Sequence, residues 1–195
     1  AFADGYRNPP PTAAGVGKAG VHRVFVDDAS AISYNPANLA FLDRSSLVFD
    51  LTMAHTESTY SGSFGEAEPD DPWQPLPNLY AAVPVGQSGI AFGLGITTPY
   101  GQGTEFNKQD LLSANTNTPS PLYEARMVAI NFNPTLAIQK GPVSIGAGLD
   151  IIYTSLEFKQ NYPWAVITTN AFPNGNAEAE GNDMAVGGNF GVTVK

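Results

Sequence analysis

The sequence IAFGLGIT, at residues 90–97, alternates strictly between large apolar side chains and small or polar ones. The same alternation occurs in LVFDLTMA at residues 47–54 and in VSIGAGLDI at residues 143–151. Because neighbouring side chains of a β-strand point to opposite faces, a period of two residues predicts strands. One face of each strand is bulky and apolar, and the other is small or polar. This is typical of strands with lipid on one side and a filled or wet lumen on the other.

The alternating pattern continues along most of the chain and predicts six strands. They cover residues 45–60, 76–85, 89–98, 123–139, 143–158 and 183–195. The connections alternate in length, with residues 61–75, 100–122 and 160–182 long and residues 86–88 and 140–141 minimal. Long loops at one end of an antiparallel sheet and short turns at the other are typical of outer-membrane barrels. We therefore predict an all-β fold, a transmembrane antiparallel up-and-down β-barrel.

Six strands are too few to close such a barrel, because the smallest bacterial examples have about eight. An open sheet in lipid would leave unpaired backbone groups along its edge. The alternation is also interrupted at Lys195, within the sixth predicted strand. We therefore expect residues 43–195 to be the first six strands of a larger, incomplete barrel.

The small-residue face of these strands is predicted to line the lumen, and it carries Asp50 and Asp150. It also carries four glycines, Gly93, Gly95, Gly146 and Gly148. Inward glycines either leave room for a segment close to the wall or allow the strands to curve. Aromatic rings near the predicted strand ends indicate a girdle at the membrane interface. These rings belong to Phe41, Tyr60, Tyr80, Tyr100, Tyr123, Tyr153 and Phe158.

The composition narrows the class of protein. Charged residues make up 14% of the chain, well below the roughly 25% that soluble domains carry. The formal net charge of -9 argues against a nucleic-acid partner, which requires a basic surface. The chain has no cysteine, which excludes disulfides and cysteine metal sites, and no metal or cofactor is expected. The longest uncharged stretch, residues 72–104, has a period of two and many prolines and glycines, so it does not predict a membrane helix.

Residues 1–42 lack a long periodicity and are predicted to form a compact, irregular leading segment. Asp28 could cap a short helical turn, and Asn35-Pro36 would end that turn. The segment contains GVGKAG at residues 15–20, which matches the glycine pattern of dinucleotide sites. Such a site needs a strand before the glycines, whereas prolines occupy residues 9–11. Close packing of a loop is therefore the favoured interpretation of these glycines.

No arrangement of residues in the sequence indicates catalysis. His22 and His55 are the only histidines, and the GxSxG pattern of serine hydrolases is absent. A membrane lipid hydrolase would need a serine within hydrogen-bond distance of one of these histidines, and we predict no such pair. The chain is therefore not expected to be an enzyme.

With these features the chain resembles the long-chain fatty acid transporter family of the bacterial outer membrane, which includes toluene and xylene channels. The resemblance covers essentially the whole chain. In the leading segment it rests on Gly15, Gly17, Asp27, Asp28 and the step Asn35-Pro36-Ala37, which look like the family's hatch. In the strands it rests on residues 77–78, 96–101, 104–106 and 187–194.

The resemblance implies a monomeric barrel of about 14 strands, plugged by residues 1–42 and embedded among outer-membrane lipid and lipopolysaccharide. It implies passive uptake of hydrophobic small molecules, either fatty acids or aromatic hydrocarbons. Ligand would first meet the third long loop, at Trp164, Val166, Ile167 and Phe172, and then the N-terminal residues Ala1 and Phe2. Hatch movement would open a path to a lateral gap, with Pro99, Gly101 and Gly103 as the candidate residues.

Two alternatives remain open at this point. No basic residue is an evident partner for a fatty-acid carboxylate, since Arg126 lies near a strand end and Lys18 in the leading segment, so the substrate could be an uncharged hydrocarbon. The second alternative is a related barrel that acts as a partner in protein secretion or surface attachment.

Overall fold

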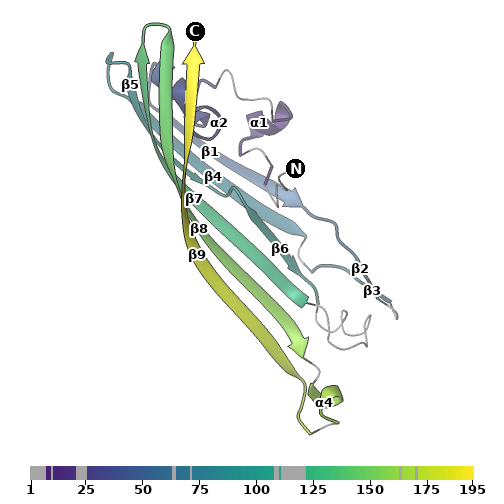
Figure 1. The fold of residues 1–195 in the computed structure, drawn as a ribbon. Coiled ribbons are helices and arrows are strands. Elements are labelled where there is room, and N and C mark those ends of the chain that lie inside the picture. The colour runs from purple at the N-terminus through teal and green to yellow at the C-terminus, as the bar shows by residue number, and fades with distance from the viewer. Residues whose placement is uncertain are drawn as a thin grey trace.

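The computed structural model of the chain describes residues 8–9, 11–20, 26–62, 65–70, 72–107, 110, 122–162, 164–169 and 171–195. These residues form one strongly curved antiparallel sheet, with short helices lying against one of its faces (Figure 1). A small hairpin, β2 (Tyr60–Gly62) and β3 (Gly65–Ala67), forms a separate two-stranded sheet.

The main sheet contains seven strands in the order β1-β4-β5-β7-β8-β9, and β6 pairs with β7 in line with β5. Every pairing is antiparallel, and β7 and β8 are joined by the shortest connection. The bounds are β1 (Ser46–His55), β4 (Trp73–Pro84), β5 (Ile90–Thr97), β6 (Gly101–Glu105), β7 (Leu122–Lys140), β8 (Val143–Tyr162) and β9 (Gly175–Val194). The predicted antiparallel meander is therefore confirmed.

The two faces of the sheet differ as the alternation predicts. On β1, the side chains of Leu47, Phe49 and Leu51 are 75%, 65% and 54% exposed. The opposite face carries buried polar side chains, namely Asn78, Thr97, Asn131, Asn133, Thr135, Ser144 and Thr193. A bulky apolar outer face with a polar inner face suits strands between lipid and a lumen.

The structure corrects three expectations about the strands. The third strand, predicted over residues 89–98, matches β5, but after a break at residues 98–100 it continues as β6, within residues that were predicted to be a long loop. The sixth strand begins at Gly175 rather than near Asp183, so the third long connection is shorter than predicted. Tyr80 does not join an aromatic girdle: its side chain is fully buried on the inner face, beneath the leading segment.

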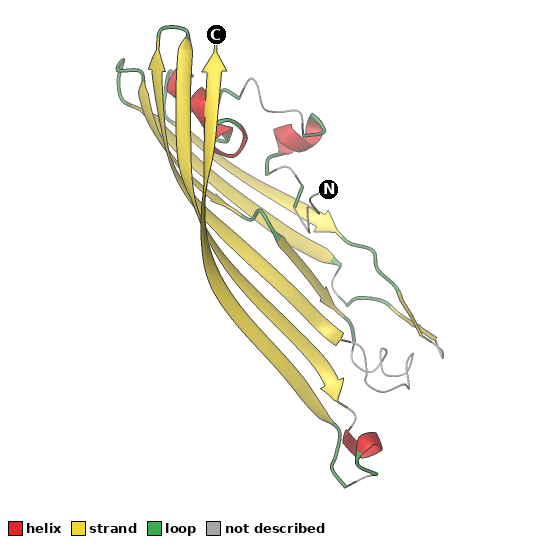
Figure 2. Cartoon of the chain, in the orientation of Figure 1, coloured by secondary structure: helices red, strands yellow, loops and turns green. Residues whose placement is uncertain are grey.

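The leading segment packs on the small-residue face of the sheet, where Figure 2 shows its short helices in red. It contains α1 (Ala13–Gly17), α2 (Ala31–Tyr34) and the 3-10 helix η1 (Pro36–Phe41). Ile32 and Leu39 from these helices form the main apolar core with Tyr80, Ala91 and Ala137 of the strands. The core is therefore the contact between the leading segment and the wall.

In the residues that the structure describes, no helix combines the length and the apolar composition needed to cross a membrane.

Candidate functional site

The step Asn35-Pro36-Ala37 attaches the leading segment to the wall. Pro36 cannot continue α2, so Asn35 ends this helix and also starts η1, where its side-chain oxygen accepts a hydrogen bond from the Ala37 N–H (3.2 Å). The Asn35 side-chain nitrogen donates to the Val192 carbonyl (3.2 Å) and to the Thr193 hydroxyl (3.0 Å). One side chain thus links two helices to β9.

Three of the four predicted inward glycines make room for the leading segment. A Cβ on Gly146 would lie 2.5 Å from the Ala37 nitrogen and from the Pro36 carbonyl carbon. A Cβ on Gly93 would lie 2.8 Å from Leu39, and one on Gly95 would lie 3.1 Å from Ile32. Gly148 instead faces side chains of the wall, namely Asn133, Thr135 and Asn189. The contacts of Gly146 are with backbone, so glycine is needed there for the leading segment to approach the wall, whereas at Gly93 and Gly95 side chains of the leading segment would have to shift.

Other hydrogen bonds hold the leading segment at several points. The Ala13 N–H at the start of α1 donates to Asp50 (2.9 Å), and the Ala29 N–H donates to the Ser46 hydroxyl (3.0 Å). The Ser33 hydroxyl donates to the Tyr80 hydroxyl (3.0 Å). Asp50 therefore lies on the lumenal face, as predicted, and it binds the leading segment there.

The remaining predicted hatch residues have different environments. Gly15 is buried in α1, whereas a Cβ on Gly17 would meet no atom within 4 Å. The first two glycines of the pattern therefore lie in a helix capped by Thr12, where close packing explains Gly15 but not Gly17, and Gly20 follows the helix with a φ of 80°. Asp27 is exposed, and Asp28 accepts hydrogen bonds from the backbone and hydroxyl of Ser30, just before α2.

Replacing Asn35 by alanine should loosen the leading segment. The substitution removes the bonds to Val192 and Thr193 and the cap of η1, and a loss of about 1–3 kcal/mol is expected when buried partners are left unpaired. Limited proteolysis of the leading segment should become about tenfold faster, while Asn182→Ala, on an exposed part of β9, should have no effect. Equal cleavage rates in the two variants would contradict this role of Asn35.

The break in the third strand leaves a gap in the wall. Strand β4 pairs with β5 only over Leu79–Pro84, and β6 pairs only with β7 among the described residues. The segment of β4 from Trp73 to Asn78 therefore has a strand neighbour on the β1 side alone. A cavity of about 260 Å³ lies at this gap, lined by Trp73, Gln74, Pro75, Gly103, Thr104, Glu105, Glu124 and Arg126.

Prolines explain why β4 does not pair with β6. In an antiparallel strand, the N–H and C=O of one residue point to the same neighbour, and successive residues alternate between neighbours. The Pro77 carbonyl accepts from the Thr98 hydroxyl (3.3 Å), which places the odd-numbered backbone groups of β4 on the side of the gap. Pro75 and Pro77 have no N–H, so two donors that β6 would need are missing. One side-chain bond crosses the gap, from the Gln74 amide to the Gly103 carbonyl (3.3 Å).

The leading segment is bonded to the break itself. The Asn8 N–H donates to the Pro99 carbonyl (3.0 Å), and the Asn8 side chain donates to the Thr98 carbonyl (2.6 Å). Of the predicted lateral-gap residues, Pro99 lies in the break, while Gly101 and Gly103 lie in β6 beside it. The leading segment therefore reaches the break and lies close to Gly101, whereas Gly103 lies beside Gln74 of β4.

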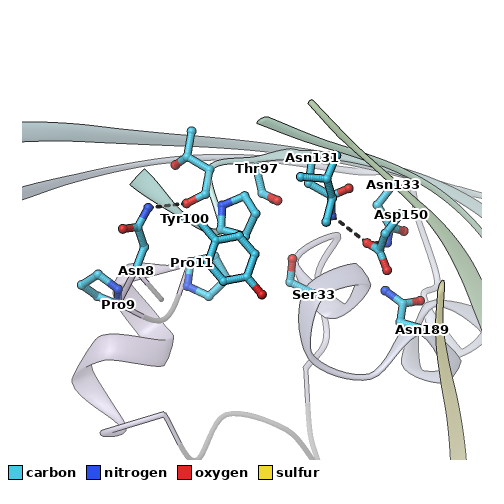
Figure 3. Close-up of a pocket in the computed structure, with 13 residues that line it drawn as sticks. Asn8, Pro9, Pro11, Ser33, Thr97, Tyr100, Asn131, Asn133, Asp150 and Asn189 are labelled. Atoms are coloured by element: carbon cyan, nitrogen blue, oxygen red, sulfur yellow. Dashed lines mark hydrogen bonds between the residues drawn. The ribbon is translucent and has the colours of Figure 1, made fainter. Parts of the chain in front are cut away.

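A second cavity of about 260 Å³ lies between the leading segment and the wall. Figure 3 shows its residues, with Asn8, Pro9 and Pro11 at one end and Asn131, Asn133, Asp150 and Asn189 at the other. Both the Asn131 and the Asn133 side chains donate to the same Asp150 oxygen, each at 2.6 Å. Asp150 was predicted to lie in the lumen, but the asparagines were not predicted. Asn131 and Asn133 are two residues apart on β7 and therefore lie on the same face.

The predicted residues of the third long loop lie far from this cavity. Trp164 starts the one-turn helix α4 (Trp164–Ile167), which lies at the opposite end of the sheet from α2 (Figure 1). Trp164 stacks on Tyr162 with ring centroids 4.6 Å apart, and Phe172 is 63% exposed. Val166 and Ile167 contribute backbone to α4, and their side chains lie outside the described part. Ala1 and Phe2 also lie outside the described residues.

A curved antiparallel sheet with an apolar outer face and a filled inner face defines an outer-membrane protein of the barrel class. The profile of the family described as "Outer membrane protein transport protein (OMPP1/FadL/TodX)" matches residues 1–195. The chain therefore belongs to this family of outer-membrane transport proteins, and its location is the bacterial outer membrane. Among curated protein sequences, none matches the chain significantly.

Solved structures of toluene transporters share the fold. TodX of P. putida aligns with a TM-score of 0.69 at 20% identity, over 90% of this chain and 50% of TodX. TbuX of Ralstonia pickettii aligns with a TM-score of 0.58 at 18% identity, over 90% of this chain and 51% of TbuX. A TodX mutant described as a monoaromatic hydrocarbon channel aligns with a TM-score of 0.65 at 18% identity, over 90% of this chain and 49% of the mutant. The chain thus spans about half the length of these transporters.

Proposed function

We propose that this chain forms the hatch and the first strands of a passive outer-membrane channel for hydrophobic compounds, with lateral release into the membrane. The observation that carries the proposal is the gap between β4 and β6, to which the leading segment is bonded through Asn8. Residues 1–42 act as the hatch and residues 43–195 as the first part of a monomeric barrel of about 14 strands. The toluene transporters with the same fold support an aromatic hydrocarbon as cargo.

The proposed path has three stages. Hydrophobic molecules first meet the exposed apolar side chains of the third long loop, including Trp164 and Phe172, within the lipopolysaccharide layer. They then enter the cavity between the hatch and the wall, near the N-terminal residues. Movement of the hatch releases the bonds from Asn8 to Thr98 and Pro99, and the cargo leaves through the gap.

Lateral release is favoured by the energetics of apolar solutes. Each CH₂ group that moves from water into an apolar environment gains about 0.8 kcal/mol. A molecule delivered sideways into the bilayer keeps this free energy, whereas passage through an aqueous pore would lose it. Pro75 and Pro77 on β4 support this function, because they prevent the closure of the wall where release would occur.

Uptake of labelled toluene and oleate by cells that carry the protein tests the proposal. Cells with the intact protein should take up at least one of the two compounds faster than cells without it. Deletion of residues 1–42 should change the rate of this uptake. The deletion variant should still reach the outer membrane. If the intact protein moves neither compound, the transport function is wrong, and the alternative role in secretion or surface attachment becomes the better explanation.

A further inference from the structure

The cavity between the hatch and the wall has two chemically different ends. Rings and apolar groups line one end, including Pro9, Pro11, Pro99 and Tyr100. Asp150 and three asparagines line the other (Figure 3). A ligand that fills this cavity therefore needs an apolar body and a polar group at one side.

Hydrogen-bond acceptors are in excess at the polar end. The side-chain nitrogens of Asn131 and Asn133 both donate hydrogen bonds to one Asp150 oxygen. The side-chain nitrogen of Asn189 donates to the Ile32 carbonyl (3.4 Å). In the part of the chain that the structure describes, the buried side-chain oxygens of Asn131 and Asn189 have no hydrogen-bond partner. Asn131 is only 9% exposed. Buried acceptors without donors cost free energy, so this end is suited to a group that donates hydrogen bonds.

The described lining of the cavity disfavours anionic ligands. None of the described residues that line it is lysine, arginine or histidine, and Asp150 supplies a carboxylate. A carboxylate ligand at the polar end would meet the like charge of Asp150 and would be repelled by it. The site therefore discriminates against the fatty-acid headgroup.

The size of the cavity limits the ligand to about one ring. An apolar cavity of about 150 Å³ accepts benzene, so the 260 Å³ found here holds a ring with one or two substituents. Pockets for larger, drug-sized ligands have about 300–1,000 Å³. A long acyl chain would extend beyond the cavity.

From these observations we propose that the cavity binds neutral one-ring compounds that carry a hydroxyl or amino donor, such as phenols, in preference to carboxylates and unsubstituted hydrocarbons. This inference rests on the proposed transport function, because it names the cargo of the same path. The ligand's O–H or N–H donates to the free Asp150 oxygen, and its ring lies against Tyr100 and the prolines.

Calorimetric titration of the full protein in detergent with phenol, toluene and benzoate tests the inference. A hydrogen bond to a charged group contributes about 1.5–3 kcal/mol, so phenol should bind about tenfold or more tightly than toluene, and benzoate should bind more weakly than phenol. Asp150→Asn should weaken phenol binding about tenfold and leave toluene unchanged. The control Asp183→Asn, which removes a carboxylate of β9 outside the cavity, should change neither.

A second variant keeps the test decisive if Asp150→Asn does not fold. Asn189→Leu removes one unpartnered acceptor and leaves both hydrogen bonds of Asp150 intact, and it should lower the ratio of phenol to toluene affinity. Equal affinities for phenol and toluene in the wild type would overturn the inference, and so would an equal loss in Asp183→Asn. If sodium or calcium competed with phenol, Asp150 would belong to a cation site, and this result would also overturn the inference. Toluene uptake measured in parallel distinguishes these results from failure of the transport function.

Discussion

Gly146→Val should push the leading segment away from the wall. The new Cβ would lie 2.5 Å from the Pro36 carbonyl carbon and from the Ala37 nitrogen, and both belong to backbone that no change of rotamer can move aside. Overpacking of this kind costs about 1–3 kcal/mol or more, and here the strain falls on the contact that holds η1. We expect limited proteolysis of the leading segment to become about tenfold faster or more.

The matched control for this experiment is Gly181→Val. Gly181 also lies in a strand, but a Cβ there would meet no atom within 4 Å. Both variants carry the same β-branched side chain, so the comparison isolates the contact with the hatch. Heat-dependent migration on gels checks that both variants still form the barrel. If Gly146→Val were cleaved no faster than Gly181→Val, the leading segment could not be packed against β8 as described.

Cross-linking β4 to β6 should stop the proposed lateral release. The chain has no cysteine, so Gln74→Cys with Gly103→Cys introduces a unique pair across the gap, at the position where the Gln74 amide now reaches the Gly103 carbonyl. Closure of this pair by a cleavable bifunctional maleimide should reduce toluene uptake at least tenfold, because the cross-link would obstruct the gap through which cargo is proposed to leave. Cleavage of the cross-link should restore uptake.

A pair elsewhere in the sheet provides the control. Ser155→Cys with Asn182→Cys joins β8 to β9, which are already paired at these residues, so cross-linking there should leave uptake unchanged. Loss of uptake with both pairs would indicate a general effect of the reagent. Full uptake through the cross-linked β4–β6 pair would show that cargo leaves by another route.

Several features of the fold were predictable because they depend on local physics. Alternation of side chains along a strand is independent of its neighbours, so residues 47–54, 90–97 and 143–151 showed which face meets lipid. The Asn35-Pro36 step was predictable because proline restricts the residue before it and cannot continue a helix. Inward glycines such as Gly146 indicated a close approach to the wall, although the segment that approaches could not be identified from spacing alone.

The polar end of the cavity and the role of Asn8 could not be predicted in this way. Asn131, Asp150 and Asn189 lie on three strands, and they meet only because the register aligns Asn131 of β7 near Asp150 of β8 and places β9 beside them. Strand β6 was not predicted, and its residues were assigned to the long loop after the third strand. The glycines of residues 101–105 weaken the alternation on which strand prediction depends. Tyr80 was misplaced because an aromatic ring suits both an interface and a core.

The residue pattern alone predicted a membrane sheet with a lipid face and a lumenal face, preceded by a leading segment without strands. These properties follow from side-chain period and backbone restriction, which act over a few residues. The folded structure was needed to show that the leading segment packs on the lumenal face, that the wall is interrupted between β4 and β6, and that Asp150 lies among asparagine side chains in a cavity. Those features depend on strand register and on contacts between residues far apart in the chain, such as Asn35 with Thr193, and no local pattern encodes them.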